Sequence, residues 1–160
     1  MDLPKRKNVR LQGYDYGQNG AYFITVCVKD RHELLGTIAV GAGSTRPSCY
    51  LSTYGIIVEN HITSISNKYQ NIVIDKYVIM PNHIHCIVII DNNNGRVDPA
   101  PTVGRIMGYF KYQTTKDIGI PGFWQRSYHD HIIRNEFEYR MIWQYIDENP
   151  QKWQEDRYYG

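Results

Sequence analysis

Two kinds of apolar pattern divide this chain of 160 residues. Short runs rich in β-branched and aromatic residues predict strands, at 21–28, 34–40, 72–80 and 83–90. Longer stretches with apolar residues at every third or fourth position predict amphipathic helices, at about 52–69, 102–117 and 135–149. Residues 123–134 alternate between polar and apolar side chains, which indicates an edge strand or an extended segment. The chain therefore mixes helices with strands, and its length favours one domain spanning residues 1–160.

Turn residues predict how these elements connect. A polar triplet at 30–32 makes a turn, so the strand at 34–40 is predicted to pair back on the strand at 21–28. Residues 81–82, Pro-Asn, form a tight connection that predicts a hairpin between the strands on either side. The polar, proline-punctuated stretch at 91–101 is predicted to be a mobile loop.

The strand at 83–90 carries two histidines in an otherwise apolar run. Because side chains alternate along a strand, His83 and His85 point to the same face. An unpaired polar group in a core costs free energy, so each imidazole has a hydrogen-bond partner or the two share a divalent metal. His129 and His131 form a second same-face pair, but its more polar surroundings favour surface or supporting roles. Two histidines are too few to hold a metal, so the first pair needs a third ligand with an oxygen or nitrogen donor.

The helix predicted at 135–149 supplies a candidate for that ligand. Asn135 begins this helix with a capping box. Pro150 is predicted to end it, because the residue before a proline is disfavoured in the helical conformation. Tyr145 and Asn149 are four residues apart, so a hydroxyl and an amide lie one turn from each other on the same face.

Together, the two histidines and the Asn149 carbonyl oxygen could surround a divalent ion. Such an ion polarises a phosphodiester, while the Tyr145 hydroxyl attacks phosphorus and becomes covalently attached. The alternative is that Tyr145 is a core aromatic residue, since the chain has fourteen tyrosines. Tyr139, Tyr109 and Tyr112 are rival nucleophiles, but only Tyr145 has a potential ligand at the right offset.

Charge and cysteine content limit the partners and the compartment. A formal net charge of +2 does not indicate bulk adhesion to nucleic acid, so any DNA site must be a local patch. Residues 1–19 contain a basic arm, and the helix at 102–117 has a face of alternating cations and rings, Arg105, Tyr109, Tyr112 and Lys116. This face could hold phosphates and bases, or it is an ordinary solvated surface. Three cysteines without paired spacing predict a reducing, cytoplasmic setting, and no segment is apolar enough to predict a membrane span.

The segment at 81–86, Pro-Asn-His-Ile-His-Cys, resembles the His-hydrophobe-His (HUH) motif of the single-strand DNA transposases. Three further segments resemble the REP-associated tyrosine transposase branch of that superfamily, at 123–126, 131–135 and 145–150. The resemblance covers about residues 22–153, which is nearly the whole chain. It implies a ferredoxin-like α+β sandwich, with an antiparallel β-sheet and helices packed on one face.

The same resemblance implies roles for the candidate site residues. His83, His85 and Asn149 would be the metal ligands, with Mg²⁺ or Mn²⁺ as the expected ion. Tyr145 would be the nucleophile that leaves a 5′-phosphotyrosine and a free 3′-hydroxyl. The protein would act on single-stranded, hairpin-bearing DNA, as a monomer or a homodimer. The expected DNA-binding residues are Arg105, Tyr109, Tyr112, Lys116, Arg126 and Arg134.

Two other functions fit the same residues. One is a catalytically silent DNA-binding regulator on the same fold, which keeps the basic and aromatic surface but forms no covalent adduct. The other is a small zinc protein in which His83 and His85 bind the metal and Tyr145 serves only in packing.

Overall fold

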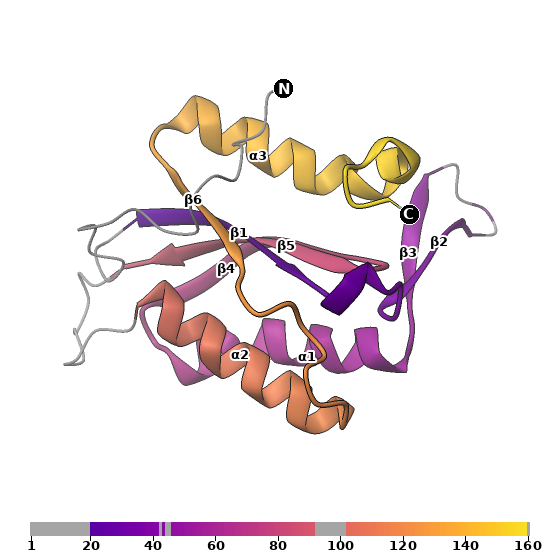
Figure 1. The fold of residues 1–160 in the computed structure, drawn as a ribbon. Helices are drawn as coiled ribbons and strands as arrows, with labels where there is room; N and C mark the ends of the chain where they lie inside the picture. Colours follow the sequence, from indigo (N-terminus) through magenta and orange to yellow (C-terminus); the bar gives the residue numbers. More distant parts are fainter. Residues whose placement is uncertain (1–19, 42, 44–45, 92–101, 160) are drawn as a thin grey trace.

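Four antiparallel strands form the main sheet of the molecule (Figure 1). Their order is β4-β5-β1-β6, and their bounds are β1 Gly20–Cys27, β4 Ile72–Met80, β5 His83–Ile90 and β6 His129–Ile133. The predicted hairpin is confirmed as β4 and β5, and the segment at 123–134 supplies the edge strand β6. The computed structural model describes residues 20–41, 43, 46–91 and 102–159. The predicted N-terminal arm and nearly all of the predicted loop at 91–101 lie outside these residues.

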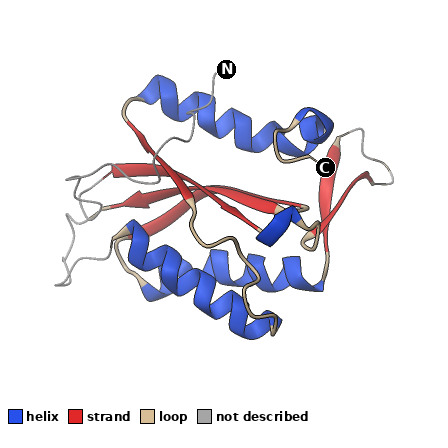
Figure 2. Cartoon of the chain, in the orientation of Figure 1, coloured by secondary structure: helices blue, strands red, loops and turns tan. Residues whose placement is uncertain are grey.

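Helices cover both faces of the sheet (Figure 2). α1 (Thr53–Lys68) and α2 (Val103–Ile118) lie on one face, and α3 (Glu136–Glu148) lies on the other. The element order β1-α1-β4-β5-α2-β6, with β1 between β5 and β6, is the ferredoxin-like arrangement. The predicted α+β class is therefore confirmed. The expectation of helices on one face holds for α1 and α2, and α3 is an addition on the opposite face.

The position of α3 follows from the alternation of side chains along β1 and β5. Phe23 and Ile87 point away from the α1 and α2 side, and they form a second apolar cluster with Ile142 and Ile146 of α3. Ile24, one residue further along β1, points into the cluster under α1 and α2. A sheet that is apolar on both faces needs cover on both faces.

Each α-helix begins at a side-chain cap, and the cap of α3 is the predicted Asn135. Ser52, Thr102 and Asn135 accept hydrogen bonds from backbone amides three residues on, at 3.1, 3.1 and 2.8 Å. Pro150 ends α3 as an α-helix, but the chain continues as a 3-10 helix, Asn149–Glu155. None of the helices described is both long and apolar enough to cross a membrane.

The strand predicted at 34–40 has a different partner from the one expected. β2 (Gly36–Val40) pairs with β3 (Pro47–Leu51) in a separate two-stranded sheet. The predicted pairing with β1 is wrong, because β5 and β6 already occupy both edges of β1. The chain leaves β1 through a short 3-10 turn, Lys29–Arg31, and the two-stranded sheet lies beyond the end of the main one (Figure 1).

Candidate metal and tyrosine site

His83 and His85 lie side by side on the face of β5 that α3 covers. Pairing with β1 places Cys27 opposite His83 and Thr25 opposite His85. The ring centroids of the two histidines are 4.6 Å apart, and their exposed fractions are 0% and 2%. The predicted same-face pair is therefore present and fully buried.

One nitrogen of each histidine has a partner and the other does not. His83 Nδ1 lies 2.7 Å from Asn82 Oδ1, and His85 Nδ1 lies 2.7 Å from Thr25 Oγ1. The Nε2 atoms of both rings are buried and have no hydrogen-bond partner among the described residues. Buried polar atoms without partners are rare because they cost free energy, so these two adjacent nitrogens suit a bound ion.

Burial keeps both imidazoles neutral. It lowers the pKa of His83 to about 3, a shift that the amide of Asn149 partly opposes. The pKa of His85 falls well below its usual value, first through burial and then through the charge of His83. Withdrawal from water disfavours the imidazolium form. At neutral pH both rings are thus in the form that binds metals.

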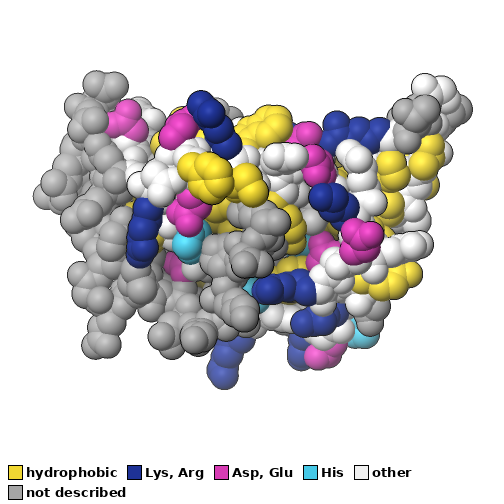
Figure 3. All heavy atoms as spheres, turned by 90° about the horizontal axis from the view of Figure 1, so that it is seen from above, with side chains coloured by type: hydrophobic (Ala, Val, Ile, Leu, Met, Phe, Trp, Pro, Cys, Tyr) yellow, Lys and Arg dark blue, Asp and Glu magenta, His cyan; other side chains and the backbone are white. Residues whose placement is uncertain are grey.

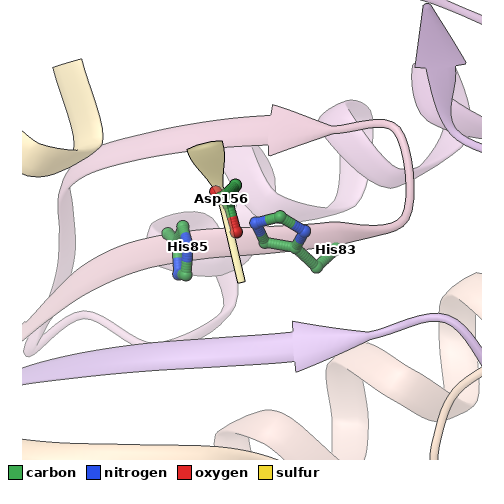
Figure 4. A group of neighbouring side chains, drawn as sticks. All are labelled: His83, His85 and Asp156. Atoms are coloured by element: carbon green, nitrogen blue, oxygen red, sulfur yellow. The ribbon is translucent and has the colours of Figure 1, made fainter. Parts of the chain in front are cut away.

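Asn149 and Asp156 approach the histidines from the C-terminal segment. Asn149 is 2% exposed, and its Nδ2 donates a hydrogen bond to Asp156 Oδ2 at 3.0 Å. Asn149 Oδ1 has no partner within the described part of the chain. Asp156 Oδ1 accepts a hydrogen bond from the backbone N–H of Tyr158 at 2.8 Å. Figure 4 shows Asp156 between His83 and His85, and the ligand atoms of these three residues lie within 4.8 Å of one another.

The spacing of this group suits a divalent ion. Bonds of about 2.1 Å place adjacent octahedral ligands about 3.0 Å apart, so the three side chains would draw together around an ion. His83, His85 and Asp156 thus form a group that could hold a divalent metal. Sequence reasoning missed Asp156, since it follows the predicted end of the last helix. The only signal was an acidic residue within an aromatic C-terminal segment.

Tyr145 of α3 is the tyrosine beside the histidines. Its ring centroid is 5.3 Å from that of His85 and 6.2 Å from that of Phe23. Burial, followed by the charge of Asp156, raises the pKa of Tyr145, and Asn149 partly opposes this rise. The phenol is therefore protonated at neutral pH, and it lies against the face that carries the unpartnered nitrogens.

The three rival tyrosines lie elsewhere. Tyr139 of α3 donates a hydrogen bond to the carboxylate of Asp75. Tyr109 of α2 packs its ring against Tyr69 of α1 at 6.0 Å, and Tyr112 is 65% exposed. Since α2 covers the opposite face of the sheet, neither of its tyrosines shares the face of the paired histidines.

The end of the chain closes over the paired histidines. The ring of Tyr158 lies 4.4 Å from that of His83, and the ring of Trp153 lies 6.1 Å away. The backbone carbonyl of Tyr158 accepts a hydrogen bond from Asn82 Nδ2 at 2.8 Å. These contacts shield the histidines from solvent, and the sequence reasoning did not anticipate them.

The second histidine pair has protein partners. His131 Nε2 lies 2.9 Å from a carboxylate oxygen of Glu138. His129 Nδ1 lies 3.4 Å from the hydroxyl of Tyr158. These partners agree with the supporting roles predicted for this pair.

The six residues predicted to bind DNA lie on α2, in the loop that follows it and just before α3. Arg105 and Tyr109 lie on the side of α2 near α1, where Lys68 Nζ sits 4.5 Å above the Tyr109 ring. Arg134 precedes α3, and its backbone N–H donates to Glu138. On the visible part of the α3 face, basic and acidic side chains are interspersed (Figure 3). Arg105, Tyr109, Tyr112 and Lys116 recur at three- and four-residue intervals on α2, so they lie along one side of this helix.

The other three predicted residues line one open groove of about 470 Å³, between the C-terminal half of α2 and residues 122–126. These residues are Tyr112, Lys116 and Arg126. Trp124 lines the groove as well, is 5% exposed, and donates from Nε1 to Thr114 Oγ1 at 2.8 Å. Lys111 Nζ donates to the carbonyls of Gln125 and Arg126 at 2.7 and 3.0 Å. These hydrogen bonds hold residues 125–126 against α2 and so fix the shape of the groove.

The chain is similar in sequence to proteins from two bacteria. An uncharacterized protein of Haemophilus influenzae is 34% identical over 173 residues, which cover 96% of this chain and 93% of that protein. The REP-associated tyrosine transposase of Escherichia coli K12 is 26% identical over 137 residues, which cover 86% of this chain and 70% of that protein. No family model matches the chain.

Two solved structures are similar to the fold. A REP-associated tyrosine transposase bound to a REP hairpin aligns with a TM-score of 0.62 and 25% identity, covering 95% of this chain and 74% of that one. A protein of Deinococcus radiodurans aligns with a TM-score of 0.50 and 15% identity, covering 86% of this chain and 95% of that one. The second likeness concerns the fold alone.

A ferredoxin-like sheet, a pair of buried histidines on its central strand and a helix carrying a tyrosine against them define a transposase-like class of protein. Within that class, the chain matches the REP-associated tyrosine transposases in sequence and in fold. The family predicted from the sequence motifs is therefore confirmed.

Proposed function

We propose that this protein is a metal-dependent endonuclease and strand transferase that acts on single-stranded, hairpin-bearing DNA. The observation that carries the proposal is a tyrosine beside buried, unpartnered ligand atoms. His83 Nε2, His85 Nε2 and Asn149 Oδ1 lack partners among the described residues, and the Tyr145 ring is 5.3 Å from that of His85. Mg²⁺ or Mn²⁺ suits this mixture of imidazole and oxygen donors.

Tyr145 is the proposed nucleophile. Its Oη bonds to phosphorus as the bond from phosphorus to O3′ breaks, which leaves a 5′-phosphotyrosine and a free 3′-hydroxyl. The phenol loses its proton in this step, and the departing O3′ gains one. When bound, a divalent ion polarises the phosphodiester and stabilises the developing charge. Burial raises the pKa of Tyr145 and so disfavours loss of its proton, and the positive charge of a bound ion would oppose this effect.

The bond energy of the cleaved phosphodiester is kept in the phosphotyrosine link. Attack by a 3′-hydroxyl on this link would therefore rejoin DNA without a nucleotide cofactor. Because Tyr145 faces His85 of its own chain, the geometry supports a monomer that acts in cis.

The groove beside α2 is the proposed DNA-binding surface. Tyr112 is 65% exposed and available to stack on a base, while Lys116 and Arg126 would neutralise phosphates. β6 begins three residues after Arg126, and its first residue, His129, lies opposite Thr25 beside the paired histidines. A single strand of DNA that runs along β6 would thus reach from the groove to Tyr145. A hairpin substrate is proposed because one similar structure is bound to a REP hairpin.

The test is denaturing gel electrophoresis after incubation with labelled hairpin oligonucleotides from the flanks of the gene, with Mg²⁺ or Mn²⁺. Wild type is expected to form a covalent protein–DNA band that requires metal. Tyr145→Phe is expected to lose the band. Tyr139→Phe, from the same helix, is the matched control and is expected to retain it. Loss of the band in the control and not in Tyr145→Phe would assign the attack to Tyr139.

A catalytically silent DNA-binding regulator is the second candidate. The observation that favours it is the closure of the site, since His83 and His85 are 0% and 2% exposed and Tyr158 lies over His83. Such a protein would bind the same hairpins and form no adduct with either metal. Gel-shift binding without any covalent band in wild type would select this function.

A further inference from the structure

We propose that Asn82 is a positioning residue that holds the proton of His83 on Nδ1 and leaves Nε2 free to bind the metal. The inference rests on the proposed metal site. It concerns the protein before any DNA is bound, so it is tested without cleavage.

The orientation of the Asn82 amide is set by two backbone carbonyls. Asn82 Nδ2 lies 2.8 Å from the carbonyl oxygen of Tyr158 and 3.4 Å from that of Arg31. Carbonyl oxygens only accept hydrogen bonds, so the nitrogen end of the amide must face them. Asn82 is 0% exposed, and its backbone carbonyl accepts a hydrogen bond from the backbone N–H of Val28 at 2.9 Å, which holds the residue in place. The amide therefore has one satisfied orientation.

This orientation determines which nitrogen of His83 carries the proton. Asn82 Oδ1 lies 2.7 Å from His83 Nδ1 and can only accept a hydrogen bond, so Nδ1 must be the donor. A neutral imidazole has one N–H, which leaves a bare lone pair on His83 Nε2. That nitrogen is one of the buried atoms without a hydrogen-bond partner in the described part of the chain. Asn82 thus prepares His83 as a ligand before the ion arrives.

His85 differs in this respect. Its Nδ1 faces Thr25 Oγ1 at 2.7 Å, and a hydroxyl can donate or accept. Thr25 alone therefore does not select a tautomer of His85. Both histidines are buried and have a partner at Nδ1. Of these two partners, only Asn82 determines which ring nitrogen carries the proton.

The first test measures the tautomers directly. Long-range ¹H–¹⁵N NMR spectra of the metal-free, full-length protein at neutral pH distinguish Nδ1–H from Nε2–H imidazoles. We expect His83 to be the Nδ1–H tautomer in wild type. An Nε2–H tautomer of His83 would overturn the proposal without any variant.

The second test compares Asn82→Leu with Asn82→Asp, and uses Mn²⁺ binding by calorimetry as the readout. Leu has a similar size but no acceptor, so a mixed tautomer and a loss of affinity of about 10–100-fold are expected. Asp keeps the acceptor toward His83 but loses the donor to Tyr158, so the wild-type tautomer and an affinity at least equal to wild type are expected. Thermal melting of each metal-free variant shows whether it is folded.

Each outcome is decisive. An equal loss of affinity in both variants would mean that Asn82 acts only by tying down the C-terminal segment, which overturns the proposal. Unchanged affinity and tautomer in Asn82→Leu would overturn it as well. If Asn82→Leu does not fold, the wild-type tautomer and the Asn82→Asp affinity still decide. A wild type that passes both tests but forms no DNA adduct would refute the proposed nuclease function alone.

Discussion

The two faces of the central sheet are built from the same strands and have opposite chemistry. Toward α1 and α2, Ile24, Val26 and Ile84 join one continuous apolar cluster. Toward α3, the intervening positions of the same strands include Thr25 and His85, and a histidine nitrogen is left without a partner in the described structure. One residue of strand register therefore separates the packing face from the chemical face.

A small fold can hold a destabilising site on one face of its sheet when the other face is well packed. Burying the two Nε2 atoms without partners disfavours folding, and the apolar cluster on the other face offsets that effect. If the faces are separate in this way, substitutions on one should change stability and substitutions on the other should change metal binding. Four experiments examine this comparison.

Ile84→Ala should have the largest effect on stability. Ile84 is 1% exposed, and its removal leaves a cavity that lowers the free energy of unfolding by about 2–5 kcal/mol. Urea unfolding followed by circular dichroism measures this change. The matched substitution is His85→Ala, on the next position of the same strand, which should cost less because it also removes an unpartnered polar atom. Equal losses for the two variants would mean that the faces are not separate.

Metal should stabilise the protein through the α3 face. Mn²⁺ at 100 times its dissociation constant should add about 2.7 kcal/mol to the free energy of unfolding. The shift in melting temperature on adding Mn²⁺ measures this gain. His85→Ala should abolish it, whereas His131→Ala should keep it because His131 is paired with Glu138. A shift that depends on His131 would place the ion at the second histidine pair.

The metal-free protein should lose stability as the pH falls below about 6.5. The pKa of His83 is lowered by burial from 6.5 to about 3, so between these values the unfolded state binds a proton that the folded state does not. Above pH 6.5 the free energy of unfolding does not change with the titration of this histidine. Below pH 6.5, and down to about 3, it falls by roughly 1.4 kcal/mol per pH unit for this histidine. Urea unfolding at several pH values in the presence of a chelator measures the slope. His83→Gln should remove the contribution of His83 and leave that of His85, whose pKa is also lowered. An unchanged slope would show that His83 does not contribute.

The smallest effect is expected where α3 is tied to the rest of the fold by charge. Asp147 pairs with Arg46 and with Lys76, each at 2.8 Å, and these cations lower its pKa. Because the groups are partly exposed, Asp147→Asn should cost about 0.5–1 kcal/mol, and less at high salt. Urea unfolding in low and in high salt measures the loss of stability and its dependence on salt. A loss as large as that of Ile84→Ala would mean that α3 depends on these ion pairs more than on Ile142 and Ile146.

Much of the fold could be predicted from the sequence because it depends on local patterns. The period of two along 83–90 placed both histidines on one face, and the cap of α3 lies at Asn135, as the capping box predicted. Tyr145 and Asn149 share a helical face through their spacing alone, although Asn149 itself falls just past the end of α3. These features follow from backbone geometry within a few residues.

The residues that complete the site belong to contacts between distant segments. The chain by itself determined the strands of its main sheet, its three α-helices, its paired histidines and the family that it resembles. Only the tertiary structure placed Asp156 between the histidines, turned the amide of Asn82 toward His83 and denied β2 an edge of β1. The physical reason is that periodicity specifies which way a side chain points, whereas packing and hydrogen bonding across the folded chain decide what it meets.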